Sequence, residues 1–410
     1  MESDKQSVGR EASSTGDTPR VAWIGLGNMG RGMVKNIAEK GTYAPPLLIY
    51  NRTAARAEKL ASTLPSGKTK VVTSIPDTVD GADIIFTCVG DDQAIEETIT
   101  AALKSPDAAK GKLFVDCSTV HPDTTNKLAQ QITSAGAHFV ACPVFGAPAM
   151  ADSGNLVCVL AGPSAQTARV KPFCQGVMSR ADIDYSDQPC GAATRLKIIG
   201  NTFIVNMVET LSEGHVLAEK SGLGSDNLHA FVETMFPGPY TAYSDRLRKG
   251  DYHKREEPLF NAHLARKDAR HAKALADSCG AKMKGLEVCD AHLKEVVEHM
   301  GDRGDIAGIY GAPIRSLRLC VGTTVGDVHK VAFAVAMMNG VHDFRSMRSE
   351  SWQKVNQFFA AFSGTAALTS MLAAGTTPRA TTTQYRAVKV HVSPATRKYR
   401  KSMQCQVVAQ

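Results

Sequence analysis

The stretch VAWIGLGNMGRGMVKNIAEKG, residues 21–41, passes from a short apolar run into a segment with helical spacing. The apolar run is typical of a β-strand, and the segment from Met29 to Lys40 is typical of an amphipathic helix that stops at Gly41. Between them lies the pattern GxGxxG, which is informative where it joins a strand to a helix. Its glycines allow a tight turn, a close approach of backbone to a pyrophosphate and close helix packing. The predicted dinucleotide-binding turn comprises Gly25, Leu26, Gly27, Asn28, Met29 and Gly30.

The alternation of strand-like and helical segments continues beyond this turn. Short apolar runs follow in the order LLIY, KVVTS, ADIIFTCVG, KLFVDCS, AHFVACPV and LVCVLAG, most of them separated by helical stretches. Such alternation predicts a parallel sheet covered by helices on both faces. We therefore expect an α/β chain with a doubly wound, Rossmann-type domain over residues 20–188. An all-helical domain is expected over residues 189–318, where strand signals are weak.

The end of the second predicted strand bears on which dinucleotide is bound. An acidic residue about 20 residues beyond the glycines would hydrogen-bond the 2′-hydroxyl of the NAD ribose. This chain has Asn51, Arg52 and Thr53 there, and no acid. The guanidinium of Arg52 can pair with a 2′-phosphate, and its two polar neighbours can donate hydrogen bonds to it. These residues favour NADP, with NAD still possible; the alternative is that Arg52 is an ordinary solvated loop residue.

Composition and charge narrow the classes of function. No apolar run approaches the roughly 20 residues of a membrane-spanning helix. The ten cysteines lie at irregular spacings without a CxxC pair, so we predict no metal site and expect reduced thiols in a cytoplasmic protein. Of the 47 lysines and arginines, 11 lie in residues 319–410, together with only 3 of the 40 acidic residues. The rest of the chain is nearly neutral, which favours a small-molecule substrate over nucleic acid.

The two ends of the chain differ from its middle. Residues 1–19 are polar and have no apolar core, so they predict a disordered leader and neither a signal peptide nor a typical transit peptide. Residues 319–410 predict a basic, partly disordered tail that contains short helix-like segments. The role of this tail stays open.

A lysine stands inside the long apolar helix predicted from Ala192 to about Ser221. An ammonium group is costly to bury unless it is paired or its charge is used. Lys197 and Asn201 lie one helical turn apart on one face, which at the junction of two domains would look into a ligand-binding cleft. A lysine with a lowered pKa can take a proton from an alcohol or give one to a carbonyl oxygen. The alternative is a lysine that reaches from a buried helix to solvent.

Five stretches together resemble the β-hydroxyacid dehydrogenase family, which includes 3-hydroxyisobutyrate dehydrogenases and glyoxylate/succinic semialdehyde reductases. The family is related to 6-phosphogluconate dehydrogenase. The stretches are WIGLGNMGRGMVKNI, DCSTVHPDT, CPVFGAPAMADSGNL, GAATRLKIIGN and FNAHLARKDARHA, which keep the family's order and spacing over about residues 20–316.

The resemblance implies a role for several residues. Lys197 matches the catalytic lysine and Asn201 a substrate-contacting asparagine. The remaining matches are to the cofactor site: Thr119 beside the nicotinamide, Lys267 as a lysine that reaches the cofactor with Asp268 next to it, and Val89 and Gly90 along the adenosine and ribose. Members of the family usually form homodimers or tetramers through the helical domain.

The chain departs from the family at two predicted substrate positions. The substrate loop of the family usually reads Pro-Val-Ser-Gly-Gly, where the serine helps to hold a carboxylate. Here the loop reads Pro-Val-Phe-Gly-Ala, so Phe145, Gly146 and Ala147 are the predicted substrate-binding residues beside Lys197 and Asn201. The hydroxyl is replaced by a ring, which predicts a more apolar or smaller pocket. Gly200 stands where the family commonly has a second asparagine.

These observations predict an NADP-dependent oxidoreductase that transfers hydride between the nicotinamide and a small alcohol or carbonyl substrate of the hydroxyacid or semialdehyde type. One alternative is an imine reductase, which shares the fold and the Asn-Arg-Thr signature but usually replaces the lysine. Another is a non-catalytic dinucleotide-binding scaffold, similar to the cytokine-like nuclear factor of chromatin, which has lost the lysine. The presence of Lys197 argues against both. The substrate and the direction of the reaction stay open.

Overall fold

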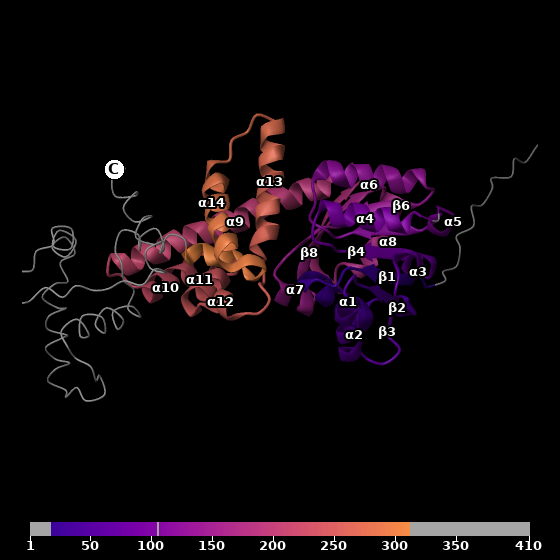
Figure 1. Cartoon of the computed structure of the whole chain (residues 1–410), viewed down its shortest axis with the longest axis horizontal. Helices are drawn as coiled ribbons and strands as arrows, with labels where there is room; N and C mark the ends of the chain where they lie inside the picture. Colours follow the sequence, from indigo (N-terminus) through magenta and orange to yellow (C-terminus); the bar gives the residue numbers. More distant parts are fainter. Residues whose placement is uncertain (1–17, 105, 312–410) are drawn as a thin grey trace, which may run out of the picture. The chain divides into compact units, whose positions relative to one another are not determined.

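A computed structural model describes residues 18–104 and 106–311 (Figure 1). Their first part is a nine-stranded sheet in the order β3-β2-β1-β4-β5-β6-β8-β7, with β9 paired to β8. The strands are β1 (Arg20–Ile24), β2 (Ala44–Tyr50), β3 (Thr69–Val71), β4 (Ile84–Thr87), β5 (Leu113–Asp116), β6 (His138–Ala141), β7 (Val144–Phe145), β8 (Leu156–Gly162) and β9 (Ser179–Ser186). All neighbouring pairs from β3 to β6 are parallel, and the order 3-2-1-4-5-6 is that of a doubly wound dinucleotide-binding fold. The α/β class expected from the sequence is confirmed.

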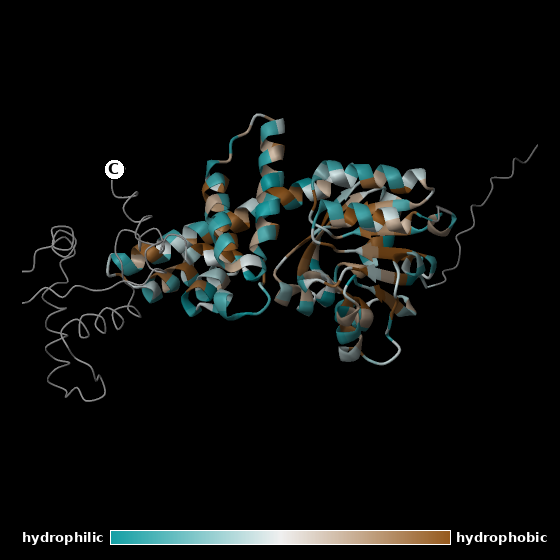
Figure 2. Ribbon diagram, in the orientation of Figure 1, coloured by the Kyte–Doolittle hydropathy of each residue, from teal (hydrophilic) through white to brown (hydrophobic). Residues whose placement is uncertain are grey.

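Helices cover both faces of the sheet because successive strand residues point to opposite sides. Val21 and Trp23 of β1 belong to one buried cluster, and Ala22 and Ile24 belong to the other. The first cluster is covered by α1 (Asn28–Lys40), α2 (Ala54–Thr63), α7 (Pro148–Ser153), α8 (Ser164–Val170) and the 3-10 turn η1 (Lys171–Phe173). The second is covered by α3 (Ile75–Asp80), α4 (Asp92–Ala102), α5 (Pro106–Ala109) and α6 (Pro122–Ser134). In Figure 2 the strands of the sheet are mainly hydrophobic, and the outer sides of the helices that cover it are mainly hydrophilic.

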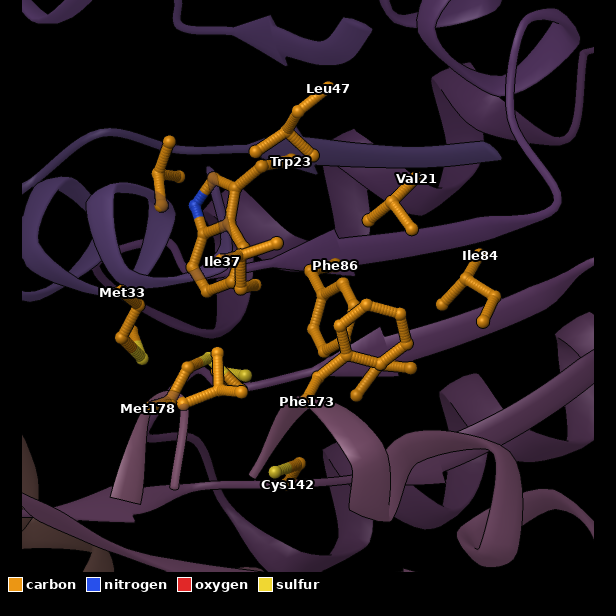
Figure 3. Packing of buried hydrophobic residues seen from close by; sticks show 14 of the residues in the cluster. Val21, Trp23, Met33, Ile37, Leu47, Ile84, Phe86, Cys142, Phe173 and Met178 are labelled. Atoms are coloured by element: carbon orange, nitrogen blue, oxygen red, sulfur yellow. The ribbon is translucent and has the colours of Figure 1, made fainter. Parts of the chain in front are cut away.

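Figure 3 shows the packing of Trp23, Phe86 and Phe173 in the core of the first face. Trp23 and Phe86 stack with ring centroids 5.4 Å apart, and Phe173 meets Phe86 edge-on at 5.5 Å. The indole N–H of Trp23 donates a 2.8 Å hydrogen bond to the carbonyl oxygen of Gly25. A buried aromatic side chain therefore fixes the turn that follows its own strand.

The sheet is not parallel throughout, which corrects the sequence prediction. β8 runs antiparallel to both β6 and β7, and only β9 is parallel to it. The connection from β6 to β8 is occupied by the two-residue strand β7 and the six-residue helix α7, which together reverse the chain without a long crossover helix. β9, Ser179–Ser186, went unpredicted because it is an edge strand that is mostly half-exposed and lacks an apolar run.

The second part of the described chain is helical. It comprises α9 (Gly191–Lys220), α10 (Ser225–Met235), α11 (Pro239–Lys249), α12 (Asp251–Lys254), α13 (Ala262–Ser278), α14 (Lys284–Met300) and the 3-10 turns η2 (Gly301–Arg303) and η3 (Ile306–Tyr310). One buried cluster joins α9, α10, α11, α13, α14 and η3. Among the described residues 191–311 there is no strand, only an isolated bridge between Asn261 and Asp305. The helical domain expected from the sequence is thus present.

The long helix α9 is less completely buried than its composition predicts. Its start packs on α6 and β8, and its middle packs on α13. Ile199, Phe203 and Leu217 are nevertheless exposed, with 72% of Phe203 accessible to solvent. The expectation of a helix enclosed between layers therefore holds for one side of α9 only.

Two sequence predictions fall on residues that lie outside the described part of the chain. These are the disordered leader, apart from residues 18–19, and the basic tail over residues 319–410. In the described ranges, no helix combines the length and the apolar character that a membrane span requires.

Candidate active site

The turn between β1 and α1 leaves open space in front of the helix N-terminus. Gly25 has a φ of +99°, and a Cβ there would lie 2.3 Å from the carbonyl oxygen of Cys88. A Cβ on Gly30 would lie 2.2 Å from the Gly25 oxygen, whereas one on Gly27 would meet nothing within 4 Å. In the described chain no side chain caps α1 at Gly27, and the first turn holds no acidic residue. The free N–H groups and the open space at Gly27 fit a pyrophosphate.

The three polar residues after β2 differ in the contacts that their side chains make. Asn51 accepts a 2.9 Å hydrogen bond from the N–H of Leu26 and donates one of 3.0 Å to the carbonyl oxygen of Thr53, so it holds the turn. Thr53 is the N-cap residue of α2, and its side chain forms no capping bond there. Arg52 is exposed, and within residues 18–104 and 106–311 no hydrogen bond or ion pair engages its guanidinium. Arg52 is thus available to an anionic group of a bound dinucleotide.

The loop before α13 is tied to the start of α1. The side-chain amide of Asn28 donates a 2.7 Å hydrogen bond to the carbonyl oxygen of Pro258. Arg31 forms a 2.7 Å ion pair with Glu257 of the same loop. Met29 packs against the first core cluster. The predicted turn residues Asn28 and Met29 therefore also connect the two domains and the core.

The predicted cofactor contacts at the ends of β4 and β5 are Val89, Gly90 and Thr119. A buried carboxylate fixes these ends: Asp116 accepts hydrogen bonds from the hydroxyl of Thr87 at 2.8 Å and from the N–H of Ser118 at 3.1 Å. The hydroxyl oxygen of Ser118 in turn accepts a 2.9 Å bond from the N–H of Val89. The Thr119 hydroxyl has no hydrogen bond within the described residues and is only partly buried.

Lys267 reaches across from α13 to both strand ends. Its Nζ donates hydrogen bonds to the carbonyl oxygens of Gly90, at 3.0 Å, and of Thr119. It also lies 3.3 Å from Oδ1 of Asp268, and both side chains are buried. Lys267 therefore joins the helical domain to the two loops that the sequence assigns to the cofactor.

A second contact holds α13 against the sheet domain. Nε2 of His271 lies 2.6 Å from Oδ2 of Asp92 at the start of α4. The other oxygen of Asp92 accepts hydrogen bonds from the N–H of His121 at 2.9 Å and the hydroxyl of Thr124 at 2.7 Å. Burial raises the pKa of Asp92, but the hydrogen bonds with His271, the His121 N–H and Thr124 outweigh it and hold this pKa well below its usual range. The carboxylate thus stays charged as an anchor for α13.

Lys197, Asn201 and Asp268 form a buried hydrogen-bonded chain between α9 and α13. Nζ of Lys197 donates a 2.9 Å bond to Oδ1 of Asn201. The amide nitrogen of Asn201 donates a 2.6 Å bond to Oδ2 of Asp268. Because Asp268 also neighbours Lys267, the predicted catalytic residues and the predicted cofactor-binding lysine meet in one cluster.

The environment of Lys197 makes its proton exchangeable near neutral pH. Burial lowers the pKa of Lys197 to about 8, the negative charge of Asp268 opposes this, and the positive charge of Lys267 adds to it. The side chain is only 9% exposed, so it does not extend into solvent. A lysine of this kind can both donate and accept a proton at physiological pH.

The predicted substrate loop brings an aromatic ring to the lysine. Nζ of Lys197 lies 4.5 Å from the centroid of the Phe145 ring. Gly146 has a φ of +141°, and Ala147 is the N-cap residue of α7. The loop predicted to bind substrate therefore adjoins the buried chain of Lys197 and presents a ring to it.

Three cysteines form a cluster that sequence spacing missed. The sulfur atoms of Cys142, Cys158 and Cys174 all lie within 4.8 Å of one another, and the three side chains are buried. Thiolates at such distances can hold a soft metal ion, although no metal site was predicted. They belong to the aromatic core of the first face, beside Phe173 and Met178. No spacing rule finds them, because they come from three separate segments.

Comparison with known proteins supports both domains. Residues 20–183 match the family described as the NAD binding domain of 6-phosphogluconate dehydrogenase. Residues 191–312 match the family described as NAD-binding of NADP-dependent 3-hydroxyisobutyrate dehydrogenase. The NADH-dependent oxidoreductase ucdB of Aspergillus ustus is 36% identical over 285 residues, which cover 69% of this chain and 95% of that protein. The chain belongs to the β-hydroxyacid dehydrogenase family.

Three further proteins are similar to this chain at lower identity. Glyoxylate/succinic semialdehyde reductase 1 of Arabidopsis thaliana is 29% identical over 64% of this chain and 87% of its own length. The cytokine-like nuclear factor N-PAC of Danio rerio is also 29% identical, over 53% of this chain and 45% of its own length. The structure of Mycobacterium tuberculosis 3-hydroxyisobutyrate dehydrogenase has the same fold, with a TM-score of 0.60 at 20% identity, over 72% of this chain and 99% of that one. The expected enzyme class, an NAD(P)-dependent dehydrogenase or reductase acting on CH–OH groups, is confirmed at the level of the β-hydroxyacid dehydrogenase family.

Several residues that shape the site were not predicted to do so. Asp116 and Ser118 lie within the matching stretch DCSTVHPDT, but only their hydrogen bonds show that they connect the ends of β4 and β5. Asp92 and His271 are separated by 179 residues, and no sequence signal links them. The sequence offers one indication, an acidic residue at the end of an apolar strand, and among these four residues it applies to Asp116 alone.

Proposed function

We propose that this chain is an NADP-dependent oxidoreductase acting on a small alcohol and the corresponding carbonyl compound, with Lys197 as the general acid and base. The observation that carries the proposal is the buried chain from Lys197 through Asn201 to Asp268. A stability role alone does not require a buried ammonium group whose pKa is lowered to about 8. This reaction class includes hydroxyacids, semialdehydes and uncharged aldehydes or ketones.

The residues fit a bound nicotinamide dinucleotide. The open space at Gly27 and the uncapped N-terminus of α1 suit the pyrophosphate. The Thr119 hydroxyl and the carbonyl oxygens held by Lys267 would surround the nicotinamide end. When bound, the reduced nicotinamide supplies a hydride to the carbonyl carbon and is itself oxidised.

The protein supplies the proton and the orientation. In the direction of reduction, the Lys197 ammonium donates a proton to the carbonyl oxygen as negative charge develops there, and becomes a neutral amine. Asn201 keeps the amine in place through its side-chain oxygen, while Asp268 fixes the orientation of Asn201. In the direction of oxidation, the neutral amine removes the hydroxyl proton. Solvent restores the resting charge of Lys197 after either reaction.

NADPH is the cofactor that the exposed end of β2 favours. Arg52 is unpaired among the described residues, and the chain lacks the acid that would bind a free ribose. The relative from Aspergillus ustus is called NADH-dependent, so the preference has to be measured on this chain. Comparing the affinities of NADPH and NADH by fluorescence titration tests it directly.

A homodimer or tetramer is the assembly that the surface of α9 favours. Phe203 and Leu217 of α9 are 72% and 68% exposed, and Phe231 and Met235 of α10 are 52% and 58% exposed. Large apolar side chains exposed on neighbouring helices are typical of a protein interface. The molar mass in solution, measured by light scattering, tests this part of the proposal.

The test of the proposed reaction is a substrate screen that follows the absorbance of NADPH. Small aldehydes, 2-oxo acids, semialdehydes and ketones are offered one by one, and the matching alcohols are offered with the oxidised cofactor. We expect at least one carbonyl class to be reduced. A protein that binds NADPH but turns over none of these compounds would have the properties of a scaffold, and one that reduces imines alone would belong to the other alternative.

A further inference from the structure

The ring of Phe145 fills the space that a side chain at position 200 would need. The ring of Phe145, on β7, lies against α9, and a Cβ placed on Gly200 would be 2.5 Å from the ring atoms Cε1 and Cζ. Real Cβ atoms do not approach carbon so closely, so the ring can keep this position only if residue 200 has no side chain. Gly200 lies one helical turn from Lys197, and the same ring also faces the Lys197 ammonium.

The two departures from the usual family sequence are therefore one structural change. By the resemblance, the family has a serine at position 145 and an asparagine at position 200. Here Phe145 replaces the serine, and Gly200 replaces the asparagine and leaves the space that the ring of Phe145 fills. The loop around the ring packs closely against β8. A Cβ on Gly146 would lie 2.6 Å from Leu156, and the backbone of Phe145 pairs with Val157 of β8.

The ring changes what the site can bind. An aromatic face attracts a cation such as the Lys197 ammonium and offers no hydrogen-bond donor to a carboxylate. Lys267, the other buried lysine of the cluster, is engaged by two carbonyl oxygens and by Asp268. A carboxylate beside the ring would have to compete for the ammonium that the reacting oxygen needs.

We propose that the Phe145–Gly200 pair sets the substrate class: an aldehyde or ketone that places an uncharged alkyl or aryl group against the ring, in place of the carboxylate of a hydroxyacid. This inference rests on the proposed carbonyl reduction and names its substrate. A contact between the ring and an apolar substituent buries area on both partners, and it leaves Lys197 to the carbonyl oxygen.

The experiment uses two substrates that differ in charge and by one methyl group. Succinic semialdehyde and its methyl ester present the same aldehyde, and the ester lacks the carboxylate. With the full chain and NADPH, we expect kcat/KM for the ester to exceed that for the acid by about tenfold or more, since one unfavourable polar contact is worth about that factor. The double variant Phe145→Ser/Gly200→Asn should reverse or reduce this ratio by about tenfold. A wild-type preference for the acid, or a ratio that is unchanged in the double variant, overturns the inference.

The pairing itself is tested without turnover. Gly200→Ala should lower the melting temperature while Phe145 is present and should not lower it in the Phe145→Ser background. Gly214→Ala is the matched control on the same helix, because its added Cβ would only approach Leu228, at 3.4 Å. Equal losses from Gly200→Ala in both backgrounds would show that the ring does not occupy this space. Failure to reduce any carbonyl would instead count against the proposed function and leave the measured coupling intact.

Discussion

The two ends of the proposed active site, the cofactor end and the substrate end, are built in different ways. The cofactor end consists mainly of backbone: Gly25 and Gly30 are glycines because a Cβ would strike main-chain atoms, and Gly27 leaves space in front of helix N–H groups. The substrate end consists of side chains from separate elements, with Lys197 on α9, Asp268 on α13 and Phe145 on β7.

This difference indicates at which positions of the site the residue type can change. At Gly25 and Gly30 a Cβ would strike main-chain atoms, so the backbone site leaves these two positions no room for a larger residue. A side-chain site can change its chemistry if two residues change together. Phe145 and Gly200 are such a pair, while the glycine turn follows the usual pattern.

The largest effect is expected at the substrate end, from loss of the proton donor. Lys197→Met keeps the volume of the side chain and should lower kcat by about 10²–10⁴, the usual contribution of a general acid or base. Lys197→Arg should not restore turnover, because a guanidinium does not release its proton near neutral pH. Affinity for NADPH should hardly change in either variant, since the phosphates are expected at Gly27. Turnover, cofactor titration and melting temperature are measured on the same samples.

Lys220→Met, at the exposed C-terminal end of the same helix, is the control and should leave kcat unchanged. The buried ammonium of Lys197 costs stability at pH 7, because the pKa is lowered by burial, so Lys197→Met should not lower the melting temperature. An arginine variant with near wild-type turnover, together with a destabilised methionine variant, would mean that Lys197 has a structural role.

The contrast between backbone and side chains also explains what the sequence could predict. The strands from β1 to β6, the glycine turn and helix α9 follow from apolar periodicity and glycine spacing, which are local properties. β9 and the antiparallel course of β8 depend on how a short connection folds back, and nothing in their own residues specifies it.

Within the site, the residue types were predictable but their partners were not. Helical spacing alone relates Lys197 to Asn201. The bond from Asn201 to Asp268 joins residues 67 positions apart, and the contact between Phe145 and Gly200 joins a strand to a helix. Such pairs are set by tertiary packing, so a single sequence can show two unusual residues without showing that they touch.

A smaller effect is expected at the cofactor end, where one side chain adds to the backbone site. Arg52→Ala should weaken NADPH binding by about 1–3 kcal/mol, the range for hydrogen bonds to charged groups, and leave NADH binding nearly unchanged. The reason is that the exposed guanidinium would meet the 2′-phosphate, which NADH lacks. Fluorescence titration of both cofactors measures the difference.

Lys59→Ala is the matched control, because it removes the same charge from an exposed position further along α2. A similar loss of NADPH affinity in both variants would reduce the role of Arg52 to general charge. Equal wild-type affinities for NADPH and NADH would contradict the 2′-phosphate argument itself and would agree with the cofactor named for the relative from Aspergillus ustus.

The smallest expected change is a shift in the pH dependence of the reaction. It distinguishes an effect of Asp268 on the pKa of Lys197 from an effect on the position of Asn201. Reduction needs the Lys197 ammonium, so its rate should fall as pH rises above about 8, while oxidation needs the neutral amine and should gain up to that pH. Asp268 raises the pKa of Lys197, so Asp268→Asn should move both profiles to lower pH and reduce the rate of reduction at pH 7 by a few-fold. Asp277→Asn, at an exposed position on the same helix, should leave both profiles in place. If Asp268→Asn lowered the rates equally at every pH, the carboxylate would act only by orienting Asn201. The pKa of Lys197 would then be set by burial and by Lys267.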